Sequence, residues 1–188
     1  MSAQNESLRP VKVDFEALEM AFEDDGMEHA NFLDLETGEV ILVTDEMKQM
    51  LEEICEEAVE DDSDSDAVLD AIEASDVPEW QKESMRDAEA VERGLGTRYL
   101  RVPDNESDEG FHDMEAFVET VPDPEFADSL LNSLGGRGSF RRFKDALHGD
   151  AEELKRWYDF KQQRVRERIT DWLESEGIQA VPLAEAVS

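Results

Sequence analysis

The sequence predicts an α+β protein in which a small antiparallel β-sheet, a hairpin plus one or two further strands, packs against several helices. Two observations favour this class. Around Thr37-Gly38 the segment NFLDLETGEVILVTD alternates apolar and polar residues, which is typical of a β-hairpin. Most other apolar residues recur at three- and four-residue spacing, which is typical of helices with one buried face.

The first elements are a polar tail, a helix and the hairpin. Residues 1–12 are expected to form a flexible tail, and VDFEALEMAFED has the apolar spacing of a helix. After the hairpin, Thr44 or Asp45 is expected to cap a helix that begins at EMKQ. An acidic segment at about residues 59–67 contains EDDSDSD, which is too charged to be buried, so we interpret it as a mobile linker.

The elements after the linker are mostly helices. Two helices are followed by TRYLRVP, a strand that is expected to join the hairpin. The next helices are expected to begin with caps at Ser107, Ser139 and Asp150, and IQAVPL is a candidate fourth strand. We therefore expect one α+β domain over residues 13–183, with a short tail at 184–188.

The net charge of −32 comes from 50 acidic against 18 basic residues, six of them Lys and twelve Arg. Such acidity is typical of a cytosolic protein adapted to high salt. An acidic mimic of nucleic acid and an acidic interaction arm made by EEAVEDDSDSD are alternatives. Because MSAQNESLRP has no apolar export signal and no run of 18 apolar residues occurs, we expect a cytoplasmic location. A lone Cys55 excludes an internal disulfide and is interpreted as a half-buried apolar residue.

Basic residues are concentrated in one part of the chain, residues 137–168. This basic island holds ten Lys or Arg against six Asp or Glu, whereas the remainder holds eight against 44. The acidity of the remainder argues against a generic binder of polyanions. The island is therefore the candidate functional surface.

The first half of the island is the helical segment SFRRFKDAL. On a helical wheel Phe140, Phe143 and Leu147 form its apolar stripe. Arg141, Lys144 and His148 lie along one flank, and Arg137 extends this row if the helix starts early. Arg142 points to the other flank. Cations in a first helical turn face the positive end of the helix dipole, so we expect a negative group beside them.

The second half of the island is the long helix after Asp150. Its apolar arc is expected to contain Leu154, Tyr158, Val165, Ile169 and Trp172, with Lys161 and Arg168 inside it and Trp157, Phe160 and Arg164 beside it. Cations in a buried seam need partners. These are carboxylates within the chain or across a subunit interface, such as those of Asp113, Glu115 and Glu119, a phosphate ligand or nucleic acid stacked on Trp157, or an acidic segment of another protein.

Catalytic patterns are weak, and neither a cofactor nor a metal is expected. His112 and Glu115 lie one helical turn apart, but two ligands are too few for a metal site. The GGRG segment lacks the preceding strand and following Lys-Ser or Lys-Thr of a phosphate loop. No catalytic residue is nominated.

Several motifs resemble a bacterial family known only as uncharacterised protein family 0158. The motifs are Met114-Glu115-Ala116-Phe117, the element GRGSFRRFKD, Trp157 with Phe160, and Trp172-Leu173, together with FLDLETGEVI. The acidic segment near residues 58–78 is interpreted as an elaboration on that pattern. The resemblance implies no activity, because the family has no assigned biochemistry. We therefore favour a non-enzymatic protein-interaction module. Nucleic-acid or phosphate-ligand binding through the island is the alternative, and an enzyme of unassigned reaction the third hypothesis.

Overall fold

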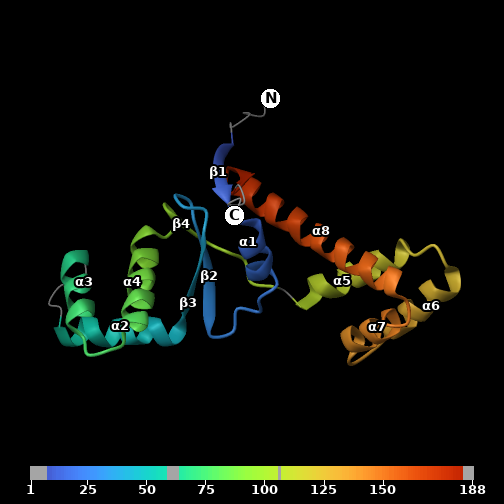
Figure 1. Ribbon diagram of the computed structural model, residues 1–188, viewed down its shortest axis with the longest axis horizontal. Coiled ribbons are helices and arrows are strands. Elements are labelled where there is room, and N and C mark those ends of the chain that lie inside the picture. The colour runs from blue at the N-terminus through green and yellow to red at the C-terminus, as the bar shows by residue number, and fades with distance from the viewer. Residues whose placement is uncertain (1–7, 59–63, 106, 184–188) are drawn as a thin grey trace. The chain divides into compact units, whose positions relative to one another are not determined.

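The structure is a computed structural model that describes residues 8–58, 64–105 and 107–183 (Figure 1). Within these residues the chain forms eight helices and five strands, which confirms the predicted α+β class. In chain order they are β1 (Arg9–Val13), α1 (Phe15–Phe22), β2 (His29–Asp34), β3 (Val40–Thr44), α2 (Asp45–Ala58), α3 (Ser65–Ala74), α4 (Glu79–Gly94), β4 (Tyr99–Arg101), α5 (Ser107–Glu119), α6 (Pro124–Ser133), α7 (Ser139–Leu147), α8 (Ala151–Ser175) and β5 (Ile178–Pro182).

The chain divides into two compact units. The first, called the N-terminal unit, comprises Met1–Asp104 together with Leu173–Ser188. The second, called the helical unit, comprises Asn105–Trp172. A single domain over residues 13–183 stays a prediction.

The N-terminal unit contains the predicted antiparallel sheet. Its strand order is β3-β2-β4, so the hairpin is extended by the strand from TRYLRVP, as the sequence predicts. In the central strand Leu33 pairs with Val40 on one side and with Leu100 on the other. β2 is buried on both faces: Phe32 packs in the core with α2, α3 and α4, and Leu33, on the opposite face, is fully buried too.

The hairpin turn lies against β1. Gly38 has a φ of 80°, and the backbone N–H of Asp14 donates to its carbonyl oxygen at 3.0 Å. A Cβ atom at Gly38 would lie 2.1 Å from the carbonyl oxygen of Lys12. Glycine is therefore required both by the left-handed backbone and by the close approach of β1.

A second sheet differs from the prediction. β1 pairs with β5 in parallel, with Arg9 opposite Ile178. Residues 9–12, expected within a flexible tail over residues 1–12, belong to this strand because Val11 and Val13 are buried on alternate positions. The candidate strand IQAVPL also forms, but it pairs with β1 and is absent from the hairpin sheet.

The core of the N-terminal unit lies between the hairpin sheet and α2, α3 and α4. Within the predicted linker, residues 59–63 lie outside the described part of the chain. The following residues are ordered as α3, whose N-terminus is capped by the Asp64 carboxylate on the N–H of Asp66 and Ala67. Val68 and Ile72 of α3 are buried in the core with α2 and α4, and this burial stabilises the helix.

The helical unit is built around aromatic rings. Phe117 of α5 makes edge-on contacts with Phe143 of α7 at 6.2 Å and with Trp157 of α8 at 5.3 Å between ring centroids. Phe160 joins the same cluster at 5.5 Å from Phe117. Leu130 of α6 is fully buried in this core, so all four helices contribute to it.

Three of the four expected helix caps can be compared with the structure, because the side chain of Ser107, the first residue of α5, lies outside the described part. The Asp150 carboxylate accepts from the N–H of Glu152 and Glu153, and Thr44 Oγ1 accepts from the N–H of Met47, so both predictions are confirmed. The prediction for Ser139 is wrong. Gly138 occupies the N-cap position with a φ of 82°, and Ser139 is the first helical residue.

His29, at the start of β2, closes the loop after α1. Its Nδ1 lies 2.7 Å from the carbonyl oxygen of Met27, and its Nε2 contacts Oδ2 of Asp24. Because both partners are acceptors, this geometry suits the doubly protonated ring. The hydrogen bond that His29 donates to Asp24 raises the pKa of His29 against the effect of burial, and the same bond lowers the pKa of Asp24.

We expect Gly38→Ala to destabilise the protein much more than Gly96→Ala. Both residues have positive φ, 80° and 77°, but no heavy atom lies within 4 Å of a Cβ at Gly96. Gly96→Ala should therefore cost only the backbone strain, about 1–2 kcal/mol, and Gly38→Ala that amount plus the clash with Lys12. Chemical denaturation measures both variants. Equal losses of unfolding free energy in the two variants would show that the hairpin turn does not approach β1 closely enough to exclude a Cβ atom.

We expect the stabilising effect of His29 to be lost at alkaline pH. The raised pKa of His29 means that its contribution is complete below its unfolded value, about 6.5, and disappears as pH rises through the folded value. The lowered pKa of Asp24 makes its own contribution disappear as pH falls below about 4. Thermal melts of His29→Gln against the parent protein should therefore differ more at about pH 5.5 than at about pH 9. The same difference at both values would contradict a charged His29.

Candidate functional site

The basic island divides between two helices of the helical unit, α7 and α8. In α7 the buried face consists of Phe143 and Leu147, which are both fully buried. Gly136 and Gly138 precede the helix with φ of 77° and 82°, so the chain turns sharply between α6 and α7. This turn and the buried face fix which side chains of α7 remain at the surface.

Arg142 binds backbone carbonyls in the turn after α6. Its Nε donates to Ser133 at 3.1 Å, its Nη1 to Arg137 at 2.5 Å, and its Nη2 to Gly135 and, at 3.3 Å, to Gly136. The carbonyls at a helix C-terminus lack partners within the helix and carry partial negative charge. The negative group expected beside Arg142 is thus the end of α6 and its turn.

The other basic residues in α7 or directly beside it are exposed, as Arg142 is. We call them the α7 basic row: Arg137, Arg141, Lys144 and His148. The Arg141 side chain is 89% exposed, and its Nε lies 3.9 Å from Oδ2 of Asp145, which is a weak contact. Within the described ranges, no carboxylate lies within 4 Å of the side-chain nitrogens of Arg137, Lys144 or His148. The fold therefore leaves these basic side chains available at the surface.

Phe140 borders the row and is less buried than predicted. Its side chain is 46% exposed, although it was expected in the apolar stripe with Phe143 and Leu147. The ring lies over Gly110 of α5, where a Cβ atom would approach it to 3.0 Å. Half of this aromatic side chain is consequently open to solvent beside the cations.

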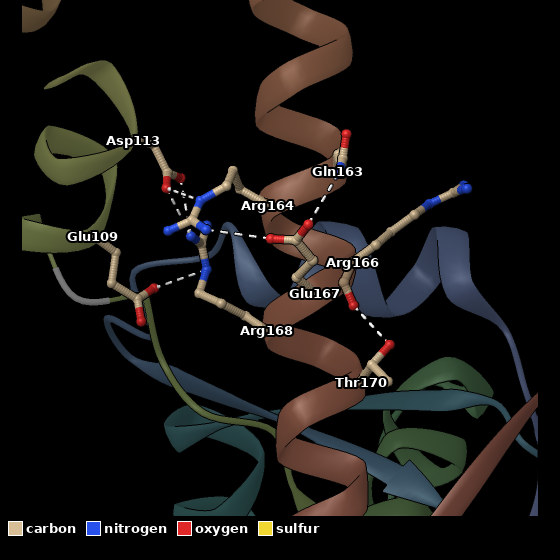
Figure 2. A network of polar contacts seen from close by, with 8 residues as sticks. All are labelled: Glu109, Asp113, Gln163, Arg164, Arg166, Glu167, Arg168 and Thr170. Carbon is tan, nitrogen blue, oxygen red and sulfur yellow. Dashed lines mark hydrogen bonds and ion pairs between the residues drawn. The ribbon is translucent and has the colours of Figure 1, made fainter. Parts of the chain in front are cut away.

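The cations of α8 are paired inside the helical unit (Figure 2). Asp113 of α5 is 1% exposed, and both of its carboxylate oxygens lie 3.0 Å from Nη1 of Arg168. Nε of Arg164 donates to Oδ1 of the same carboxylate at 3.2 Å. This hydrogen bond raises the pKa of Arg164. Two guanidinium groups thus share one buried carboxylate.

Two further carboxylates balance the second positive charge. Glu109 Oε2 lies 3.4 Å from Nε of Arg168, and Glu167 Oε2 lies 3.2 Å from Nη1 of Arg164. We call the five residues the Asp113 layer: Glu109, Asp113, Arg164, Glu167 and Arg168. Of the three partners named from the sequence, Asp113 lies in this layer, whereas Glu115 and Glu119 are exposed.

The aromatic residues of α8 are arranged differently from the prediction. Trp157 is only 4% exposed and lies 5.0 Å from Phe143 in the core, although it was placed beside the apolar arc. Tyr158, placed inside the arc, is 51% exposed. Phe160 and Lys161 are half-buried. A small error in the rotation of the predicted helical wheel explains why Trp157 is buried and Tyr158 exposed, the reverse of the prediction. Trp157 is therefore not accessible for stacking on a base.

Arg156 has a structural role that sequence reasoning missed. Its Nη1 lies 2.9 Å from Glu153 Oε1, its Nη2 donates to Thr120 Oγ1 at 2.5 Å, and its Cζ lies 5.0 Å from the centre of the Phe117 ring. The three-residue spacing from Glu153 was the available signal. The contact with Phe117 depends on tertiary packing and has no local signal.

A second buried carboxylate lies in the N-terminal unit. Asp34, 2% exposed at the end of β2, is bound by Arg98 through Nε at 3.1 Å and Nη2 at 2.7 Å. Burial acts to raise the pKa of Asp34, but hydrogen bonds from Arg98 and from the N–H of Glu36 and Thr37 lower it overall. Its position directly after the apolar pair Phe32-Leu33 was the sequence signal.

The described ranges of the chain hold no group of three His, Cys, Asp or Glu side chains placed to bind a metal ion. His112 and Glu115 are both exposed on α5. No helix in the described ranges combines the length and the apolar content needed to cross a bilayer.

We expect Arg168→Ala to lower the free energy of unfolding by about 3 kcal/mol, because one partner of a nearly buried carboxylate is removed. Arg141→Ala is the matched control, since its exposed pair contributes less than about 1 kcal/mol. Urea denaturation compares the two variants. Adding Asp113→Leu to the Arg168 variant should recover part of the loss, because the unpaired buried charge disappears. An Arg168→Ala effect no larger than the control would show that the Asp113 layer is not stabilising.

Comparisons with known proteins place the chain in a family. A model of the uncharacterised protein family UPF0158 matches residues 61–186, so residues 61–78, expected to be an elaboration, lie inside the match. The UPF0158 protein PA5073 of Pseudomonas aeruginosa is 27% identical over 172 residues, which are 92% of this chain and 88% of that protein. No solved structure matches the chain significantly. The resemblance found in the motifs is thereby confirmed, and the chain belongs to the uncharacterised protein family UPF0158.

Proposed function

We propose that the protein is a non-enzymatic interaction module and that the α7 basic row binds an acidic segment of a partner protein. One observation carries the proposal. In the described ranges, the four side chains of the row have no carboxylate closer than the 3.9 Å contact between Arg141 and Asp145. In a chain with 50 acidic residues, basic side chains without a close carboxylate partner favour a role outside folding.

The fold of α7 does not depend on the row. Phe143 and Leu147 attach the helix to the core, and Arg142 attaches it to the turn after α6. Arg141 lies in the first turn, where a cation opposes the helix dipole by about 0.3–1 kcal/mol. The first turn contains no acidic residue. A bound anion would remove this disadvantage.

The observations favour an acidic protein segment over nucleic acid. Binding of single strands commonly uses several exposed aromatic rings on which bases stack. Trp157, the ring named for stacking, is buried, which leaves the half-exposed Phe140 beside the row. The chain outside the island carries eight basic against 44 acidic residues, so a long polyphosphate is repelled along most of its length. A short acidic segment touches the row alone. The cytoplasmic location expected from the sequence belongs to this proposal.

We expect Arg141→Ala/Lys144→Ala to weaken binding of a labelled glutamate-rich peptide at least about tenfold in about 0.1 M salt. Fluorescence anisotropy measures this, with single-stranded DNA of equal charge as the second probe. The control is Lys48→Ala/Lys155→Ala, which also removes two exposed positive charges, here two lysines that are each already paired with a neighbouring carboxylate.

The outcomes separate the hypotheses. Loss of peptide binding in the α7 variant, with retention in the control, supports the proposal. Tighter binding of the DNA, lost in the same variant, favours the nucleic-acid alternative. Failure of the parent protein to bind the peptide, or equal losses in both variants, overturns the proposal.

A further inference from the structure

We propose that the segment bound by the α7 basic row is an acidic amphipathic helix, with carboxylates at positions i, i+3 or i+4, and i+7. This inference rests on the proposed function. It concerns the shape of the partner segment, whereas the proposed function concerns only its charge. It is carried by the spacing of the row, its rigidity, its apolar border and a similar arrangement within this chain.

The spacing of the row matches one face of a helix. Arg141, Lys144 and His148 fall within about 60° on the helical wheel and extend over about 10.5 Å along the axis. A second helix presents its own side chains at the same intervals when the two axes run side by side. An extended segment advances about 3.3 Å per residue and turns alternate side chains away, so fewer of its carboxylates meet the row.

The row is held rigidly. Phe143 and Leu147 are fully buried beneath it, and Arg142 binds the carbonyls of Ser133 and Gly136 on the other flank. A fixed helix presents its cations at fixed intervals. A partner of matching periodicity loses less conformational freedom for each ion pair it forms than a flexible segment does.

The helical unit already contains a helix pair of this kind. Glu109 and Asp113 lie one turn apart on α5, and Arg164 and Arg168 lie one turn apart on α8 (Figure 2). Arg168 contacts both carboxylates and Arg164 contacts Asp113. Carboxylates and cations at one-turn spacing on two helices therefore meet directly in this protein, and we infer the same pattern for the partner.

The borders of the row define the rest of the partner. Phe140, 46% exposed, lies on the side of the row toward the core and offers an apolar contact that shields ion pairs from salt. Asp145, with a 66% exposed side chain, lies on the opposite side and repels a carboxylate there. The partner helix is thus expected to carry an apolar residue on one flank of its acidic face and a neutral or basic residue on the other.

Three synthetic peptides of about 18 residues test the inference. The first carries glutamates at helical spacing with leucine on one flank, the second is a scrambled isomer, and the third has proline at its centre. We expect the full-length protein to bind the first at least about tenfold more tightly than the others. Arg141→Ala/Lys144→Ala should abolish the preference, and Lys48→Ala/Lys155→Ala should retain it. Circular dichroism establishes that the variants remain folded.

Failure of this inference can be distinguished from failure of the proposed function. If all three peptides bind equally and the α7 variant loses them all, the acidic partner stands and its helical form is wrong. If no acidic peptide binds, both are wrong. A charge-swapped pair adds a gain of function: Arg141→Glu/Lys144→Glu should bind the patterned peptide in which lysines replace the glutamates. If the swapped variant binds the lysine peptide no better than the parent protein binds it, the inference is contradicted.

Discussion

The helical unit depends on one interaction, the binding of the buried Asp113 carboxylate by Arg164 and Arg168. A carboxylate removed from water costs several kcal/mol unless cations and hydrogen bonds replace the solvent. Asp113 therefore holds α5 beside α8, where Phe117, one turn further along α5, enters the aromatic core. Asp34 with Arg98 makes the same kind of contact in the N-terminal unit. A chain with twelve arginines and 50 acidic residues thus uses several of those arginines to neutralise carboxylates at or near its cores.

This use of arginine divides the basic island by role. Arg164 and Arg168 are bound to Asp113, Arg156 to Glu153 and Thr120, and Arg142 to carbonyls after α6. The α7 basic row remains at the surface. In an acidic protein, a surface of this kind attracts anions only at short range, because the surrounding carboxylates repel them at greater distance. Short contacts that exclude water, made with a partner of complementary shape, fit that constraint better than the long-range attraction of a charged polymer such as nucleic acid.

Local patterns predicted the elements well and the long-range pairing poorly. The hairpin follows from alternation around Gly38, and the α7 row from helical spacing, because both depend on neighbouring residues. β1 was missed because a five-residue strand containing Pro10 is recognisable only beside β5, which lies far along the chain. Trp157 and Tyr158 were exchanged because their burial is decided by α5 and α7. Likewise, which cations are free depends on where Asp113 lies, and no spacing within the island contains that information.

The division of the island is tested most directly by the reactivity of its arginines. Phenylglyoxal modifies accessible guanidinium groups, and mass spectrometry follows each arginine of the folded protein over time. Arg137 and Arg141 should be modified at least about tenfold faster than Arg168, because the Arg168 guanidinium group is bound to a buried carboxylate and shielded from the reagent. If Arg168 reacts as fast as Arg141, the Asp113 layer does not hold it, and the distinction between internal and available cations is wrong.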